Sequence, residues 1–309
     1  MAINLASIRD MLLPGLMSLP GRYDAIEKEW PQLFETRDSN MAQESAVATA
    51  YLPLAQLKTE GGPTSFDNNA GEFYRVNFVH AEVGLGYAIT RKAIDDNLYK
   101  QQFQPSNLGL AFSFNQFKEI NGASVLNGAT STSSSFQSGG DGQALCSTSH
   151  PTQQGGGITI ANRPTVDQDL GEGALLNAMI AIRTNWRDNR GLKILGRAKK
   201  LVVPTSLEPI AIRLTKTDLR PGTGNNDVNA ILTTSGGIPE GYMVNDYLTS
   251  VYAWFLLTNI PGLIHLKRKA FEVDMQVDFI TDNLLVKGYE RYSFGYEDFR
   301  AIYGSFPTS

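Results

Sequence analysis

The residue types that could do chemistry gather in one short segment of this sequence, DGQALCSTSHPTQQGGG, at residues 141–157. The segment contains Cys146, which is the only cysteine, and His150, which is one of three histidines. A cysteine nucleophile needs a base within hydrogen-bonding reach and a third group that orients this base. The spacing therefore raises the hypothesis of a cysteine hydrolase that uses Cys146 and His150.

The surroundings of the two residues favour another interpretation. Catalytic cysteines usually lie on a rigid element, commonly at the N-terminus of a helix, where the thiolate is stabilised. Cys146 and His150 are instead flanked by glycine and serine, and Pro151 follows directly. We therefore expect an inert cysteine and a structural histidine, and we keep the hydrolase as an alternative.

No other pattern indicates an active site, a metal site or a cofactor site. His80, His150 and His265 are dispersed, and no cysteine–histidine pair has the spacing of zinc ligands. The glycine-rich segments GEG at 171 and PGTGNND at 221 match no nucleotide-binding pattern. The sequence predicts no catalytic residue, no metal and no cofactor.

Composition and charge narrow the class of protein. The chain has 309 residues, of which 42% are hydrophobic and 19% charged, as in ordinary folded proteins. Its net charge of −4 argues against a dedicated nucleic-acid binder, which would carry a basic surface. The longest uncharged apolar run, residues 250–266, is shorter than the ~20 residues of a membrane-spanning helix. No secretion signal is visible, so we expect a soluble intracellular product without a membrane partner.

The elements that would have to position these residues begin with an arm and a hairpin. Residues 1–46 have short apolar helical turns and an amphipathic piece around Trp30, with too little apolar surface to fold alone. The arm must therefore lie on its own body or on a neighbour. Residues 47–59 and 72–84 predict two long strands joined by a turn at 60–71. Each strand would extend about 40 Å at ~3.3 Å per residue.

A helical region and a long loop follow the hairpin. Residues 88–127 have helical spacing, and we expect an interruption at Pro105, which would begin a second helix. Residues 128–164 are rich in serine, threonine and glycine, which predicts a flexible connection.

The second half of the chain alternates helices and strands. Residues 166–186 predict a helix, and residues 198–215 predict a strand, a turn and a helix with Ser206 as N-cap. Residues 271–279 alternate strictly between apolar and polar side chains, which predicts a strand with one buried face. A second such strand is expected at 284–296. The fold class is therefore α+β.

An arm and a hairpin that cannot be stable alone, in a chain without a credible active site, indicate a protein that assembles with copies of itself. The candidates for contacts between subunits are Phe66, Asp67, Asn68 and Asn69 at the hairpin tip and Trp30 in the arm.

The order of these elements resembles the major capsid protein of tailed bacteriophages, which has the Hong Kong 97-type fold. ALCSTSHP is similar to an L-x-S-T-x-H-P signature of Mu-like head subunits. AKKLVVPTSLEPIA, NDYLTSVYAWFLLT and GYEDFRAIYGS also resemble segments of those subunits, in the same order along the chain.

The resemblance implies a layout and a function. The layout comprises an N-terminal arm at 1–46, an extended hairpin loop at 47–84, a spine helix with its connecting loop at 85–164, an axial domain at 165–264 and C-terminal strands that return to the peripheral domain at 265–309. The implied function is structural and without catalysis: self-assembly into the icosahedral head shell that encloses double-stranded DNA.

The resemblance also implies partners and a location. The chain would form hexamers and pentamers with its own copies and contact a portal protein, and packaged DNA would lie nearby without specific contacts. Because only about 45 residues precede the hairpin, we expect a separate scaffolding protein. A cement or decoration protein is an optional partner. The protein would be a virion component that assembles in the host cytoplasm. The alternative within the same fold is the shell of an encapsulin-like nanocompartment.

Overall fold

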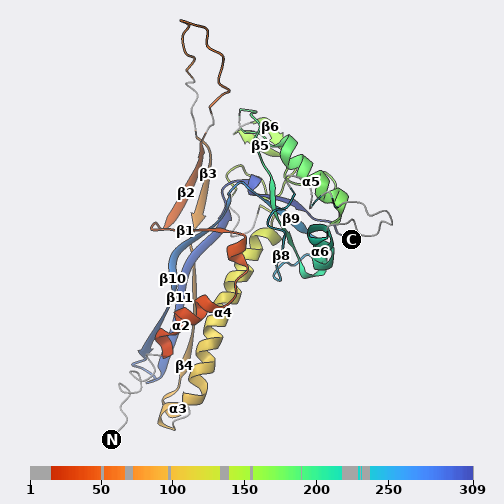
Figure 1. Cartoon of the computed structure of the whole chain (residues 1–309). Helices are drawn as coiled ribbons and strands as arrows, with labels where there is room; N and C mark the ends of the chain where they lie inside the picture. The colour runs from red at the N-terminus through yellow and green to blue at the C-terminus, as the bar shows by residue number, and fades with distance from the viewer. Residues whose placement is uncertain are drawn as a thin grey trace.

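The computed structural model describes residues 15–49, 52–66, 72–96, 99–132, 139–153, 156–188, 190–217, 229, 231 and 237–308. These residues form an elongated body, a more compact body beside one end of it, and a narrow projection that extends away from both (Figure 1).

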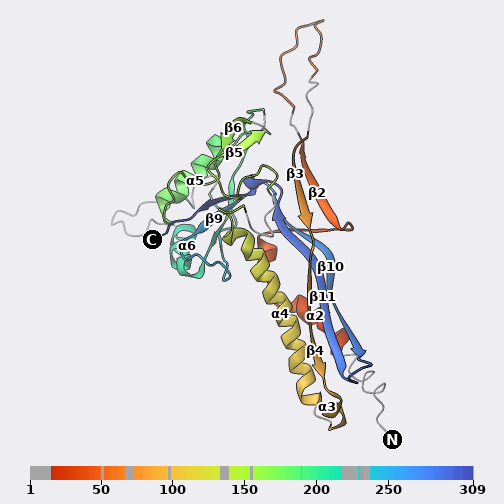
Figure 2. The ribbon, with the colours of Figure 1, turned by 180° about the vertical axis from the view of Figure 1, so that it is seen from behind.

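Long strands and one long helix form the elongated body. Its elements are α2 (Leu19–Ala25), η1 (Trp30–Gln32), β1 (Glu35–Asp38), β4 (Ala81–Ile89), α3 (Arg91–Asp95), α4 (Tyr99–Asn127), β10 (Leu263–Val277) and β11 (Leu284–Tyr296). The strand order is β1-β10-β11-β4, with β1 parallel to β10 and the other neighbours antiparallel. Seen from both sides, α4 follows the strands along most of their length (Figures 1 and 2). Leu19, Phe114 and Phe271 belong to the apolar cluster that joins α2 and α4 to this sheet.

The compact body is built on a second sheet. Its elements are β5 (His150–Gln153), β6 (Gly156–Ile160), α5 (Glu172–Asn185), β7 (Ala198–Val203), η2 (Thr205–Leu207), α6 (Glu208–Lys216), β8 (Tyr242–Val244), β9 (Trp254–Thr258), η3 (Phe299–Ala301) and β12 (Ile302–Ser305). The four-stranded sheet has the order β12-β9-β7-β8, and β5 pairs only with β6. Leu201 and Val203 face α5 and α6, whereas Val202 faces the core shared with α4 and β11. Because both faces of β7 are covered, its sequence is continuously apolar at its end.

The projection is the hairpin, and its strands are shorter than predicted. β2 (Gln43–Thr49) pairs antiparallel with β3 (Glu72–Val79), so pairing starts earlier in the arm and ends earlier in the hairpin than expected. Residues 52–66 have no regular strand structure. At the other end, residues 81–89 leave the hairpin and pair with β11. A two-stranded ribbon of the predicted length would lack an apolar face to support it, which explains the correction.

The helix at 88–127 also differs from the prediction. Ile89 ends a strand, and α4 runs from Tyr99 to Asn127 with Pro105 inside it, so Pro105 does not begin a second helix. A proline inside a helix loses one backbone hydrogen bond and costs about 3 kcal/mol. Burial of Phe103, Leu110 and other side chains of α4 against the sheet offsets this cost.

Within 128–164, the described residues 128–132, 139–153 and 156–164 are not the flexible loop that was expected. They contain the β5–β6 pair, and His150 and Asn162 are completely buried. In these residues, small side chains allow close packing.

Two smaller predictions need correction, and the fold class is confirmed. Ser206 does not cap α6, because its hydroxyl donates to the carbonyl oxygen of Val251. The alternating strand begins at Leu263 and ends at Val277, so Phe279 lies beyond it in a turn and is 97% exposed. Phe271 and Met275 are buried as the alternation predicts. Mixed helices and antiparallel strands give the expected α+β class.

Candidate functional site

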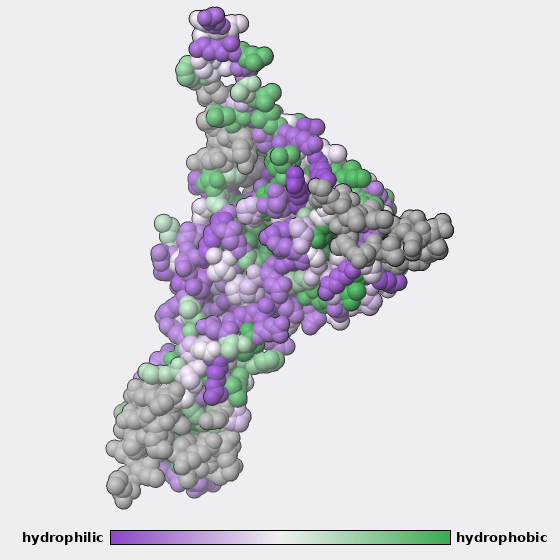
Figure 3. Space-filling view, viewed as in Figure 1, coloured by the Kyte–Doolittle hydropathy of each residue, from purple (hydrophilic) through white to green (hydrophobic). Residues whose placement is uncertain are grey.

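The far end of the projection exposes large apolar side chains. Phe66 is 86% exposed and lies on the returning side of the hairpin, four residues after the turn at Thr59–Gly62. Three leucines on the incoming side of the hairpin are exposed as well: Leu52, Leu54 and Leu57. Figure 3 shows hydrophobic side chains along the projection, away from the body. Asp67, Asn68 and Asn69, which were predicted as contacts, lie outside the described residues.

The backbone of this segment explains the exposure. Gly61 has a φ of 73°, and the Gly62 N–H donates to the carbonyl oxygen of Thr59 at 3.0 Å, which closes a turn. Pro53 and Pro63 lack the N–H that a strand partner would need. The segment therefore lies away from its own core, and its apolar side chains face outward.

Trp30, the candidate in the arm, lies in a different environment. It is only 8% exposed and belongs to the chain's own core. Its ring lies 4.3 Å from that of His265 and 5.6 Å from that of Phe294, centroid to centroid. The Glu119 carboxylate accepts hydrogen bonds from the backbone N–H groups of Glu29 and Trp30. Trp30 thus anchors the arm on its own subunit, which corrects its assignment as a contact between subunits.

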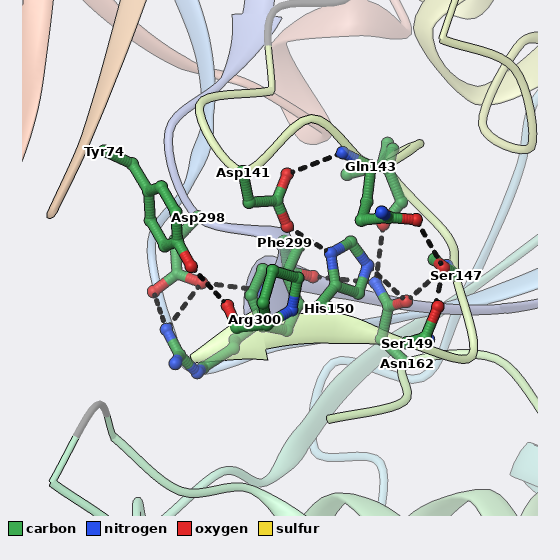
Figure 4. A network of polar contacts seen from close by, with 12 residues as sticks. Tyr74, Asp141, Gln143, Ser147, Ser149, His150, Asn162, Asp298, Phe299 and Arg300 are labelled. Carbon is green, nitrogen blue, oxygen red and sulfur yellow. Dashed lines mark hydrogen bonds and ion pairs between the residues drawn. The ribbon is translucent and has the colours of Figure 1, made fainter. Parts of the chain in front are cut away.

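His150 lies at the centre of a buried polar cluster in the compact body (Figure 4). Its Nδ1 is 2.5 Å from Asp141 Oδ2, and its Nε2 is 3.1 Å from Asn162 Oδ1. The ring stacks on Phe299 with centroids 3.8 Å apart and planes 1° from parallel. The side chain is therefore fixed on both edges and on one face.

The hydrogen bonds of Asn162 determine which atoms of His150 donate. Asn162 Nδ2 shares its two hydrogens among the carbonyl oxygens of Leu145, Phe299 and Ile302, which lie within 3.1 Å of it, and these three acceptors identify this atom as the amide nitrogen. Asn162 Oδ1 only accepts, which requires a hydrogen on His150 Nε2. Because Nδ1 lies 2.5 Å from Asp141 Oδ2, a proton lies between these two atoms, and a hydrogen bond joins the ring to Asp141.

This geometry does not form the cysteine–histidine dyad. Both nitrogens of His150 are engaged by Asp141 and Asn162. Cys146 is 2% exposed, and burial raises the pKa of its thiol well above the usual range. A thiol that is hard to ionise and lacks a base is a poor nucleophile. The sequence did not reveal Asp141 and Asn162, which are nine and twelve residues from the histidine.

A second buried charge pair joins α4 to β11. Lys118 Nζ contacts Glu290 Oε1, and these side chains are 4% and 2% exposed. The ammonium also lies 4.6 Å from the ring centroid of Tyr292, and the Tyr23 hydroxyl donates to Glu290 at 3.3 Å. Burial lowers the pKa of Lys118 and raises that of Tyr23. Together with Tyr23, the pair connects the arm, α4 and the sheet. In the sequence, its only signal is that Lys118 and Glu290 are charged residues within partly apolar stretches.

The described part of the chain contains no group of three or more histidine, cysteine, aspartate or glutamate side chains arranged to hold a metal ion. None of its helices combines the length and the apolar character needed to cross a membrane.

Comparison with solved structures shows the fold. A structure titled Microbacterium phage Oxtober96 contains a chain that is 11% identical with a TM-score of 0.52, and the alignment covers 92% of each chain. The capsid of cyanophage P-SCSP1u gives 10% identity and a TM-score of 0.53, covering 92% of this chain and 89% of that one. A virus-like particle from Pyrococcus furiosus gives 9% identity and a TM-score of 0.52, covering 94% and 97%.

Comparison of sequences shows the family. No curated protein matches the chain. A family model described as phage capsid protein matches residues 75–305, which is well over half of the 309 residues. The chain belongs to this phage capsid protein family and is a shell-forming major capsid protein with the Hong Kong 97-type fold.

Proposed function

We propose that this capsid protein assembles into hexamers and pentamers of identical copies, which form the icosahedral head shell of a tailed phage around double-stranded DNA. The observation that carries this proposal is the projection with its exposed Phe66, Leu54 and Leu57. Isolated subunits rarely keep such side chains in water at the end of a projection, whereas subunits of an assembly cover them.

The part of the hairpin that follows its turn is the proposed contact between neighbouring subunits. Phe66, Asp67, Asn68 and Asn69 would reach an adjacent copy, where Phe66 would be buried. Full burial of one such side chain contributes roughly 1.5–3 kcal/mol. Each contact is weak, but a closed shell repeats it many times. The proposal also includes the layout predicted from the sequence, namely arm 1–46, hairpin loop 47–84, spine helix and connecting loop 85–164, axial domain 165–264 and returning strands 265–309. The paired strands of the hairpin are 43–49 and 72–79.

The partners follow from the same proposal. With a net charge of −4, the subunit would hold DNA by enclosure rather than through a basic binding face. A portal protein and a separate scaffolding protein would act during assembly in the host cytoplasm, and a cement protein would be optional. The role would be structural throughout, since His150 and Cys146 do not form a dyad.

An encapsulin-like nanocompartment remains the second candidate. It is supported by the similarity to the Pyrococcus furiosus virus-like particle, whose TM-score of 0.52 equals that of the Microbacterium phage protein. The family match favours the phage shell.

Native mass measurement and negative-stain microscopy of the purified protein test the assembly. At 33.8 kDa per subunit, the smallest icosahedral shell of about 60 copies would have a mass of about 2 MDa. Packaged nucleic acid in particles from infected cells would support the phage head, and particles that hold only protein cargo would support the nanocompartment. A subunit that stays monomeric at high concentration, with and without scaffolding protein, would contradict both.

A further inference from the structure

The hairpin does not lie flat on the body near its base. A cavity of about 290 Å³ separates Ala46 and Ala48 of β2 from Tyr296 and Arg300 of the C-terminal segment. Apolar packing holds only the root, where Val76 and Phe78 meet β10 at Ile264 and Leu266. An element held at one place can pivot there, so its direction requires a second attachment.

The second attachment is a closed ring of contacts beside the cavity. The Tyr74 hydroxyl of β3 donates to the carbonyl oxygen of Pro151 at 2.6 Å. The neighbouring residue, His150, pairs with Asp141 at 2.5 Å. Gly140, next to Asp141, packs against the hairpin and closes the ring. A Cβ at this position would lie 2.7 Å from Tyr74 Cβ and 3.0 Å from a methyl group of Val76. Only glycine allows this approach.

His150 connects this ring of contacts to the rest of the subunit. The stack on Phe299 and the hydrogen bond to Asn162 join it to the C-terminal segment. Asn162 in turn binds the carbonyl oxygens of Phe299 and Ile302. The side chains of Asp141 and His150 are 6% and 0% exposed, so the hydrogen bond that closes the ring is shielded from water.

We infer that the Asp141–His150–Asn162 cluster positions the β2–β3 hairpin, setting the direction in which its tip leaves the subunit. The inference rests on the proposed function, because direction matters only where the tip must meet a neighbouring copy. It gives the ALCSTSHP segment a role in assembly geometry rather than in catalysis.

Asp141→Ala tests the inference in the unassembled subunit. Spin labels at Leu57→Cys on the hairpin and Val166→Cys on the compact body, both exposed positions, report the distance between the two parts. Cys146 is buried and stays unlabelled. We expect the distance distribution to broaden roughly twofold in Asp141→Ala, because opening of the ring frees the hairpin to pivot. Tyr74→Phe, which removes another link of the ring, should broaden it too.

Asp141→Asn separates positioning from general loss of stability. Its amide can donate to a neutral His150 Nδ1 while Nε2 still donates to Asn162, so we expect a narrow distribution and normal assembly. The matched control is Asp188→Ala, which removes another buried aspartate whose carboxylate accepts two backbone hydrogen bonds in a loop.

The outcomes are distinct. A wild-type distribution in folded Asp141→Ala would overturn the inference, as would equal broadening in Asp188→Ala. Because the distances are measured without assembly, a wild-type protein that forms no shells would contradict the proposed function and leave this test intact.

Discussion

Burial determines the behaviour of single residues here, and Cys146 is the clearest example. Its sulfur lies in the core, where a Cβ on Gly304 of β12 would come within 2.9 Å of it. The sequence predicted an inert cysteine in a flexible connection. In the structure, the backbone around it is fixed, since its N–H donates to the carbonyl oxygen of Ala129 at 2.7 Å.

We therefore expect Cys146→Ser to lower the free energy of unfolding by ~1–3 kcal/mol, because the new hydroxyl is buried without a partner. Chemical denaturation of the unassembled subunit measures this change. Cys146→Ala is the control, since it removes the sulfur without adding a polar group, and it should cost less. Assembly of the folded fraction should be normal in both variants. If serine is as stable as cysteine, the hydroxyl has found an acceptor, and the site is more polar than described.

At the scale of elements, the buried Lys118–Glu290 pair holds α4 against β11. Removing one member leaves the other as an uncompensated buried charge. We expect Glu290→Gln to lower the free energy of unfolding by ~3–5 kcal/mol, and the double variant Lys118→Met with Glu290→Gln to lose less than the sum of the single variants.

Glu82→Gln is the control for this prediction. Glu82 pairs with Arg291 on the same sheet, but its side chain is 61% exposed. The loss of an exposed pair should cost less than about 1 kcal/mol. Equal losses in Glu82→Gln and Glu290→Gln, measured by denaturation of the subunit, would show that burial does not strengthen the pair.

The elements also show what the sequence could and could not predict. Periodicity identified α5, β10 and β11, because each buries a regular face and its apolar residues repeat accordingly. A short apolar run identified β7, which is covered on both faces. It failed where partners distant in the chain decide the outcome. Pro105 stays helical because the sheet packs against α4, and residues 81–89 form an edge strand because β11 supplies the partner.

The same reason explains what the sequence revealed of the candidate site. Local composition identified Phe66 as a candidate contact residue, because one large apolar residue in an otherwise polar segment can be recognised from the sequence alone. It could not exclude Trp30, whose burial depends on Phe294 and His265, more than 200 residues away. It also treated His150 as unfixed, because nothing in a glycine- and serine-rich segment indicates that Asp141 and Asn162 would close on it.

At the scale of the whole molecule, the elongated subunit has exposed aromatic residues far apart. Phe66 lies on the projection and is 86% exposed, and Phe279 lies in the β10–β11 turn and is 97% exposed. Neither contributes to the subunit's own core. Any stabilisation by these two side chains therefore comes from contacts made after folding. Substituting them should change assembly and leave the stability of the subunit nearly unchanged.

We expect Phe66→Ala to change the Tm of the unassembled subunit by less than about 1 °C, since almost no surface is lost from the core. Assembly should be weakened or misdirected, because each hairpin tip loses roughly 1.5–3 kcal/mol of contact with a neighbour and the loss repeats around the shell. Thermal melts beside sedimentation of assembled particles make the comparison, with Phe279→Ala as an equally exposed phenylalanine on another element. Equal assembly defects in both variants would mean that shells respond to surface hydrophobicity in general. A large fall in Tm with normal assembly would place Phe66 in its own subunit's core and contradict the role proposed for the hairpin.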